Sequence, residues 1–301
     1  ENDMNYKMID FQRHGDARGM LVAVEEGKEI PFEVKRVYYM YDTGATVRRG
    51  YHAHLKLEQI LICIHGSCKI HLEDGEGTTE VVLDRPDEGL YLSRNVWREM
   101  YDFSKDAVLL VLASELYDES DYIRDYNEFS RIYLGEKISL NHSYRMFPLE
   151  SALFHARRGF IRERCVSNSR YKGYVGSVGT VDSRIDIPFE IRRAFYVFDT
   201  ARDVVRGCHS NKKSRFALIC LTGSCRVRVR KSGNENEDET FLLDHPDKVL
   251  VLSEMAWKEM YDFSEGSVLL CLSSEKYDSG EYVRSFHDFL EYVDEIKTAP
   301  V

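Results

Sequence analysis

Apolar residues in this chain fall in short runs that end at Gly, Asp or Pro. Such runs, rich in β-branched and aromatic residues, are typical of strands bounded by turns. In the first half they are VKRVYYMYD (34–42), EQILICIHG (58–66), CKIHLEDG (68–75), GLYLS (89–93) and AVLLVLAS (107–114). Many short strands in so short a stretch predict a β-barrel or jelly roll, which can hold a ligand in its mouth.

Turn residues and the ends of the two halves add further detail. The segment IHGSCKIHLEDGEG predicts two successive hairpins, with turns at Gly66-Ser67 and Asp74-Gly75. Helical patterns follow the last strand of each half, in DESDYIRDYNEFSRIYL (118–134) and DSGEYVRSFHDFLEYVDEI (278–296). We therefore expect a short C-terminal helix to close each half.

The chain is an internal duplication. Three segments of the first half return in the same order in the second: 30–43 as 187–200, 83–104 as 243–264, and 114–129 as 274–289. The spacing lengthens near RKSGNENEDET (230–240), which predicts a longer polar hairpin loop there. Two complete copies indicate two like domains rather than a solenoid. We place their boundary in 136–146, which gives an N-terminal domain at 1–140 and a C-terminal domain at 141–301.

Charge and cysteine content narrow the class of protein. The net charge of −10 argues against a general nucleic-acid binder, because such proteins are normally basic. No apolar run is long enough to span a membrane, and no signal-peptide pattern opens the chain. Seven Cys without the density of a disulfide scaffold favour a reducing cytoplasm. In particular, the two CxxxxC pairs, Cys63/Cys68 and Cys220/Cys225, fall in apolar strands and are more typical of core residues than of zinc ligands.

The segment RRGYHAH (48–54) has the most residues of catalytic or ligand-binding type. His52 and His54 share one face of a strand, because side chains alternate with a period of two. The pair fits hydrogen-bonded structural histidines, a metal site, or acid–base catalysis by imidazole. The metal interpretation uses the spacing HxHxxxE with Glu58, but it needs a late His, and SRNVWREM (93–100) has none.

Several linked motifs together resemble one family. They are DARGML (16–21), IPFEVKRVYYMYD (30–42), RGYHAH (49–54), QILICIHGS (59–67), LDRPDEGLYL (83–92) and YDESDYIRDYNEF (117–129). In order and spacing they resemble the cupin sugar-nucleotide 3,4-ketoisomerases, which act on dTDP-4-keto-6-deoxyglucose. The resemblance covers 7–130 and, less well at the pocket, 171–290. It implies an all-β fold of two tandem cupin (jelly-roll) domains and a ligand that is a dTDP-linked 4-keto-6-deoxyhexose.

The resemblance also implies a reaction and its residues. The ketone moves from C4 to C3 through an enediolate, and neither a metal nor a redox cofactor is required. His52 and His54 fall on the proton-transfer pair, and Arg49 on a residue that holds pyrophosphate or an oxyanion. Tyr39 and Trp97 line either the pocket or the core, and Arg98 points to the face opposite Trp97 unless a bulge intervenes. The full set of weaker substrate-binding candidates is Arg18, Tyr39, Gln59, Trp97, Arg98 and Glu99.

The second copy keeps only part of this set. It retains Arg206, His209 and Trp257, but Asn211 replaces His54, Phe216 replaces Gln59, and Phe195 replaces Tyr38. The favoured hypothesis is an active N-terminal domain, with the second domain as a degenerate partner in an intramolecular cupin pair, and with a possible homodimer. Other hypotheses are a divergent site that isomerises another sugar, or one that binds a nucleotide sugar without turnover.

Three functions compete with ketoisomerase. A 3,5-epimerase also removes protons beside a C4 ketone, but its His-Asp pair and Tyr acid are not visible at matching positions. A metal-dependent cupin oxygenase would contain a metal. A sugar-nucleotide sensor would bind the ligand and leave its C3 hydrogen unexchanged in D₂O.

Overall fold

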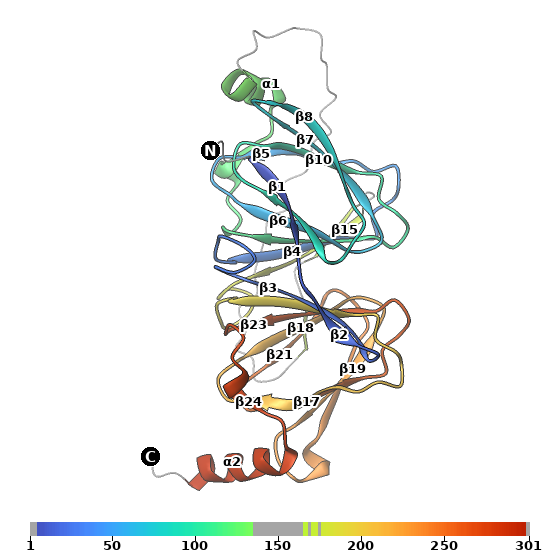
Figure 1. The fold of residues 1–301 in the computed structure, drawn as a ribbon, viewed down its shortest axis with the longest axis vertical. Helices are drawn as coiled ribbons and strands as arrows, with labels where there is room; N and C mark the ends of the chain where they lie inside the picture. The colour runs from blue at the N-terminus through green and yellow to red at the C-terminus, as the bar shows by residue number, and fades with distance from the viewer. Residues whose placement is uncertain (1–4, 135–164, 168–169, 174–175, 299–301) are drawn as a thin grey trace. The chain divides into compact units, whose positions relative to one another are not determined.

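The computed structural model describes residues 5–134, 165–167, 170–173 and 176–298. Contacts divide the chain into two compact units (Figure 1). The first unit comprises residues 1–10, 35–157 and 169–180, and the second comprises 11–34, 158–168 and 181–301. Each is built from one seven-stranded and one five-stranded sheet, with antiparallel pairing between neighbouring strands.

In the first unit the larger sheet has the order β1-β9-β6-β11-β4-β15-β14, and the smaller has β12-β5-β10-β7-β8. The alternation of buried and half-exposed residues in β7, from Cys68 to Asp74, is that of a strand with one face on a core. The strands are β1 (Tyr6–Asp10), β4 (Arg36–Tyr41), β5 (Arg49–His54), β6 (Gln59–His65), β7 (Cys68–Asp74), β8 (Gly77–Leu83), β9 (Glu88–Leu92), β10 (Trp97–Tyr101), β11 (Val108–Ala113), β12 (Tyr122–Ile123), β14 (Arg170–Gly173) and β15 (Gly176–Asp182).

The second unit repeats this arrangement. Its larger sheet has the order β13-β21-β18-β23-β16-β3-β2, and its smaller sheet has β20-β19-β22-β17-β24. The strands are β2 (Arg13–Asp16), β3 (Gly19–Glu25), β13 (Cys165–Ser167), β16 (Arg193–Phe198), β17 (Arg206–Asn211), β18 (Phe216–Thr222), β19 (Cys225–Arg230), β20 (Glu239–Leu243), β21 (Lys248–Leu252), β22 (Trp257–Tyr261), β23 (Val268–Ser273) and β24 (Tyr282–Val283). Two like units of this kind confirm the predicted tandem all-β fold.

The two units exchange a hairpin. The β2–β3 pair from the first repeat belongs to the second unit, where β3 pairs with β16 along its whole length. The β14–β15 pair from the second repeat belongs to the first unit, where β15 neighbours β4. In Figure 1 the dark-blue β2 and β3 accordingly lie among yellow-to-red strands. The predicted boundary at 136–146 lies outside the described residues, so the division at residue 140 stays a prediction.

Each unit has an apolar interior between its sheets. The first contains Leu61, Cys63, Cys68 and Leu109, all nearly inaccessible to solvent. The second contains the corresponding Leu218, Cys220, Cys225 and Leu269. Full burial of a Leu side chain contributes about 1.5–3 kcal/mol. The paired Cys residues are therefore core side chains, as the apolar strands around them predicted.

One local prediction was wrong. The segment at Gly66-Ser67 is not a hairpin, because β6 pairs with β9 and β11 while β7 pairs with β8 and β10. The chain crosses there from one sheet to the other, and Gly66, at φ +70°, makes the turn. The turn after Asp74 does connect a hairpin, β7–β8, as predicted.

The predicted short helix at the end of each repeat is present, but in the first repeat it occupies only the last part of the helical pattern at 118–134. The segment forms a 3₁₀ turn η1 (Glu119–Asp121), strand β12, helix α1 (Tyr126–Phe129) and a π-helical turn η2 (Ser130–Leu134). The carboxylates of Asp118 and Asp125 each accept backbone N–H groups, so each starts its own turn. In the second repeat a 3₁₀ turn η4 (Ser279–Glu281) and β24 precede α2 (Phe286–Thr298). Between β19 and β20 the longer polar loop, with η3 (Glu235–Glu237), is present as predicted.

Candidate active site

A β-bulge in β5 shapes the site of the first unit. Gly50 has φ +93° and Tyr51 has φ +53°, and the register with β10 shifts at this point. A Cβ atom at Gly50 would lie 2.5 Å from the carbonyl oxygen of Arg98, so only Gly fits here. The shift sets His52 opposite Arg98. The bulge lies in β5 and not in β10, where alternation holds and Arg98 points to the face opposite Trp97, as the period of two predicts.

The two imidazoles of the motif lie edge to face. The ring centroids of His52 and His54 are 4.8 Å apart, at an interplanar angle of 81°. The ring of Tyr122 lies against both, at 5.0 Å from His52 and 4.3 Å from His54. The alternation in β5 therefore does place both histidines on one face.

A buried carboxylate fixes the tautomer of His54. Its Nδ1 lies 2.9 Å from Oδ2 of Asp121, while Oδ1 of Asp121 accepts the backbone N–H of Lys56 at 2.7 Å. A carboxylate only accepts, so Nδ1 of His54 carries the hydrogen and Nε2 carries a lone pair. Nε2 is buried and has no hydrogen-bond partner among the residues that the structure describes.

A backbone carbonyl fixes His52 in the same way. Nδ1 of His52 lies 2.9 Å from the carbonyl oxygen of Gly50, so Nδ1 donates and Nε2 keeps its lone pair. Burial, then the neighbouring His54 and Arg98, lower the pKa of His52 well below its usual value. Burial and Arg98 likewise lower the pKa of His54. Both imidazoles are therefore neutral bases near pH 7.

Arg98 supplies an unusual positive charge. Its side chain is 1% exposed, and within the described chain none of its three guanidinium nitrogens has a hydrogen-bond partner. Burial lowers its pKa to about 10, against the opposing effect of Tyr38, Tyr122 and Asp121, so it remains a cation at neutral pH. Unpaired buried donors are costly in the free protein. Such a group is suited to an anionic ligand or a developing oxyanion.

Tyr38, rather than Tyr39, belongs to this site. Gln59 Nε2 donates to the Tyr38 hydroxyl at 2.8 Å, and burial raises the pKa of Tyr38 to about 12. Tyr39 has the opposite phase of β4: it is fully buried and faces Gly179, where a Cβ atom would touch its ring. The repeats held the missed signal, because Tyr38 and Gln59 change together, to Phe195 and Phe216.

Asp121 and Tyr122 were also missed by the sequence analysis. The helical pattern over 118–134 hid them, because it gave no sign that these residues form a 3₁₀ turn and a strand. The structure pairs Tyr122 with His54 in the ladder between β12 and β5. This pairing holds both residues against the histidines.

Three predicted residues lie elsewhere in the first unit. Arg49 lies beside Thr43 and Gly176 at the β15 hairpin. Trp97 packs on Tyr126 and Phe129, and its indole nitrogen lies 3.4 Å from Glu99. These contacts put Trp97 and Glu99 on the outer face of β10, away from Arg98.

Arg18 lies in the other unit, because the exchanged hairpin carries it there. Its carbonyl oxygen accepts a hydrogen bond from Arg206 Nη1 at 3.1 Å, and its side chain pairs with Asp16. The structure therefore groups Arg18 with Arg206 of the second copy and does not bring it to His52 and His54.

The second unit has the same bulge but a different interior. Gly207 and Cys208 have φ of +83° and +51°, and His209 Nδ1 lies 2.9 Å from the carbonyl oxygen of Gly207. Burial lowers the pKa of His209 to about 3. Trp257, like Trp97, packs on the outer aromatic cluster, against Phe286 at 5.0 Å.

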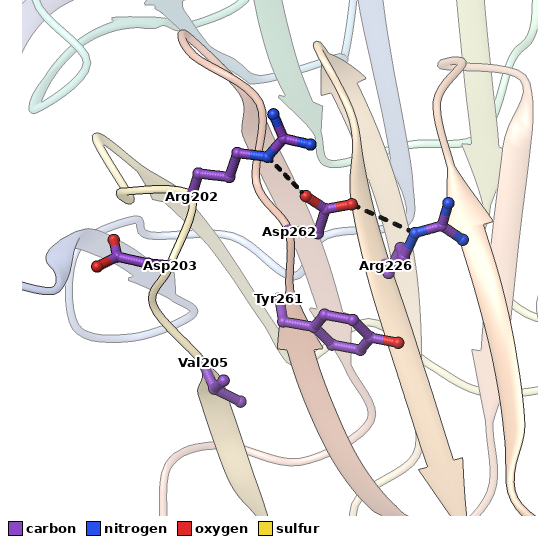
Figure 2. A pocket seen from close by; sticks show the side chains of 6 residues that line it. All are labelled: Arg202, Asp203, Val205, Arg226, Tyr261 and Asp262. Atoms are coloured by element: carbon purple, nitrogen blue, oxygen red, sulfur yellow. Dashed lines mark hydrogen bonds and ion pairs between the residues drawn. The ribbon is translucent and has the colours of Figure 1, made fainter.

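A separate pocket lies on the surface of the second unit (Figure 2). It has a volume of about 860 Å³ and is lined by Arg202, Asp203, Val205, Arg226, Tyr261 and Asp262. Asp262 accepts from Nε of Arg202 at 2.9 Å and from Nε of Arg226 at 3.3 Å. None of the predicted site residues lines this pocket, so it is distinct from the candidate site.

In the HxHxxxE spacing that was considered for a metal site, the Glu makes a hydrogen bond to a tyrosine. Glu58, its third residue, accepts a hydrogen bond from the hydroxyl of Tyr91. Among the described residues, one cluster has groups close enough to share a metal ion: His287, Asp288 and Glu291, exposed on α2. Separately, none of the described helices has the length and apolar character needed to cross a membrane.

Comparisons with known proteins agree with the resemblance seen in the sequence. The curated TDP-4-oxo-6-deoxy-α-D-glucose-3,4-oxoisomerase of Aneurinibacillus thermoaerophilus is 54% identical over 128 residues, which are 42% of this chain and 92% of that protein. A crystal structure of a 3,4-ketoisomerase from Helicobacter canadensis is 52% identical, with a TM-score of 0.43 over 44% of this chain and 99% of its own. A variant of the 3,4-ketoisomerase QdtA from Thermoanaerobacterium thermosaccharolyticum, solved with TDP-4-keto-6-deoxyglucose, is 43% identical, with a TM-score of 0.43 over 45% of this chain and 99% of its own. The family described as FdtA, WxcM-like, C-terminal, matches residues 4–133 and again 166–294, so the chain belongs to this family and carries it twice.

Proposed function

We propose that the first unit is a sugar 3,4-ketoisomerase that moves the ketone of a TDP-linked 4-keto-6-deoxyglucose from C4 to C3. One observation carries the proposal: two neutral imidazoles with Nε2 lone pairs lie beside a buried guanidinium that lacks partners in the described chain. The names of relatives that are 43–54% identical to this chain support the same activity.

The geometry suggests how protons move. Nε2 of one imidazole removes the proton from C3, and the electrons of that C–H bond form a C3–C4 double bond while the C4 oxygen becomes an oxyanion. The imidazolium so formed, or its partner imidazole once protonated, gives a proton to C4. Transfer of the O3 hydroxyl proton to O4 completes the change, so the product is an isomer with no net gain or loss of atoms. Positioned acid–base groups typically contribute about 10²–10⁴ in rate.

Arg98 stabilises the charge that this path creates. Its guanidinium is already desolvated and without hydrogen-bond acceptors in the described chain, so the oxyanion would receive donors that need no reorganisation. The Tyr38–Gln59 pair offers further polar groups on the same inner face. Arg49 and Arg18 are not needed for this step, and a role for either in holding the nucleotide stays a prediction.

The experiment is an NMR time course in D₂O with dTDP-4-keto-6-deoxyglucose. We expect a 3-keto product with deuterium in the ring, and loss of the 3-keto product in His52→Asn and in His54→Asn. His65→Asn is the matched control, because His65 lies at the end of β6 and its ring Nδ1 lies 3.0 Å from the carbonyl oxygen of Asp106 rather than against the histidine pair. A wild-type protein that neither exchanges nor isomerises contradicts the proposal and leaves a binding role to be tested by calorimetry.

We also propose a cytoplasmic location, and six described Cys residues that are free thiols support a reducing compartment. Pairing of the two cupins within the chain and assembly into a homodimer remain predictions. Light scattering on purified full-length protein measures the oligomeric state directly.

A further inference from the structure

Three inner residues of the second unit differ from the first in a coordinated way. Glu281 stands at the position of Asp121, Asn211 at that of His54, and Lys258 at that of Arg98. All three are at most 5% exposed. Glu281 is an acid, Lys258 is a base, and the side chain of Asn211 bridges them.

The contacts form a continuous relay. Glu281 Oε1 accepts from Asn211 Nδ2 at 3.2 Å, and Asn211 Oδ1 accepts from Lys258 Nζ at 2.6 Å. Glu281 is itself held by the backbone N–H groups of Lys213 and Ser214. The acid therefore orients the bridge, as Asp121 orients His54 in the first unit.

The sizes of the three side chains compensate one another. Asn is shorter than His, and Glu is one methylene longer than Asp, so the carboxylate still reaches the bridge. The amide oxygen of Asn211 points away from the carboxylate, and Lys258 Nζ lies just beyond it. On the His54 ring the side away from Asp121 is occupied by Nε2. The amine of Lys258 therefore lies on the side of the bridge away from the acid.

The surroundings of Lys258 favour a neutral amine. Its side chain is 4% exposed, and Nζ lies 4.6 Å from the centroid of the Phe216 ring, which replaces Gln59. No carboxylate of the described residues forms an ion pair with it; its hydrogen-bond partner is the uncharged amide of Asn211. Burial lowers its pKa to about 7, while Cys271 and Glu281 act in the opposite direction.

His209 completes the arrangement. It stands opposite Lys258 in the ladder between β17 and β22, as His52 stands opposite Arg98. Its Nδ1 is bound to Gly207 and its ring lies 4.8 Å from Tyr282, so Nε2 keeps a lone pair on the same face.

We propose that the second unit holds a divergent proton-transfer site, in which the Lys258 amine and the His209 imidazole act on a C–H bond beside the ketone of a nucleotide-linked keto-deoxysugar. The inference rests on the function proposed for the first unit and extends it to this one. The Lys258 nitrogen takes the proton from the carbon and becomes an ammonium, while the C–H electrons form an enediolate. The ammonium or a protonated His209 then returns a proton to carbon, so the step needs no other reactant.

The test uses the full chain with the first site disabled by His52→Asn and His54→Asn together. Deuterium incorporation from D₂O into dTDP-4-keto-6-deoxyglucose is followed by NMR between pH 5.5 and 9. We expect exchange above the buffer rate that rises through about pH 7, as Lys258 loses its proton. The other titratable groups that face Lys258 are His209 on β17, Cys271 on β23 and Glu281 in η4. Burial lowers the pKa of His209 to about 3 and raises the pKa of the Cys271 thiol, so neither titrates in this range.

Three further variants in this background identify the base. Lys258→Met and His209→Asn are each expected to reduce exchange by about 10²-fold or more. Lys258→Arg retains a cation in a similar volume but cannot accept a proton, so it must also lose exchange if Lys258 is the base. Thermal unfolding checks that each variant folds.

The outcomes separate this inference from the proposed function. Wild-type isomerisation combined with no exchange in the double variant overturns the second site and leaves the first intact. Exchange that survives Lys258→Met, or that Lys258→Arg retains, overturns the role of the amine. An inactive wild type with exchange that depends on Lys258 would instead refute the activity of the first unit and support the second site.

Discussion

Asp121→Asn tests how the first site fixes its base. The carboxylate accepts two hydrogen bonds, one from Nδ1 of His54 at 2.9 Å and one from the backbone N–H of Lys56 at 2.7 Å. An amide has one oxygen and one NH₂ group, so an acceptor remains at only one of the two positions that the carboxylate oxygens occupy. The backbone N–H cannot change its role, whereas the imidazole can move its hydrogen. The amide oxygen therefore stays on Lys56, and NH₂ faces His54.

This change reverses the tautomer of His54. Nδ1 must then accept, and the hydrogen moves to Nε2, which is the nitrogen proposed to act as the base. Loss of one positioned base corresponds to a fall in kcat of about 10²–10⁴, or about 3–5.5 kcal/mol in the activation barrier. KM should change by no more than about threefold, because Asp121 itself is not proposed to contact the substrate.

The assay is the D₂O exchange and isomerisation time course, with kcat and KM measured separately. Asp125→Asn is the matched control: it makes the same chemical change close by in the chain, and Asn is as good a helix N-cap as Asp. A folded Asp121→Asn protein with kcat within about twofold of wild type would refute the idea that Asp121 sets the reactive tautomer.

Three further predictions follow from the described contacts. Arg98→Met is expected to lower kcat by about 10²–10³, because it removes an oxyanion donor. It is also expected to raise Tm, because it removes a buried cation that has no hydrogen-bond acceptor among the described residues. Unchanged kcat contradicts the first part. Because the pKa values of His52 and His54 are lowered, kcat is expected not to decrease as the pH falls through 6.5. The free energy of unfolding is expected to decrease at pH values below 6.5, because the unfolded chain binds protons there that the folded chain does not. The decrease is about 1.4 kcal/mol per pH unit for each His. Deletion of 147–301 removes β14 and β15 from the first unit, so a monomeric fragment is expected to lack isomerase activity, and light scattering with an activity assay would detect an active monomer if the reasoning is wrong.

The sequence predicted the fold because strand patterns repeat and because both copies carry the same turns. It predicted that the two histidines lie together, because the period of two along a strand decides which side chains share a face. It could not predict the exchange of hairpins, because the pattern of apolar and polar residues in β3 would fit the sheet of either unit equally well. It also offered Tyr39 rather than Tyr38, because the pattern does not settle the phase of β4, and it did not show that a bulge in β5 sets Arg98 opposite His52. Asp121 was hidden by a helical pattern that two capping Asp residues interrupt.

The differences between the two interiors occur in contacting sets rather than singly. The hydrogen-bonded pair Tyr38–Gln59 becomes the edge-to-face pair Phe195–Phe216, with ring centroids 6.3 Å apart. Loss of a polar partner alone would leave its mate buried and unsatisfied, which costs about 1–3 kcal/mol. The acid, bridge and base of the relay also changed as a set, and their hydrogen bonds connect without a gap. If the second site were unused, we would expect its polar residues to be lost independently of one another. Here residues that contact one another were replaced together, and their hydrogen bonds are satisfied. Lys258 is therefore the residue of the second unit to test for a role in catalysis.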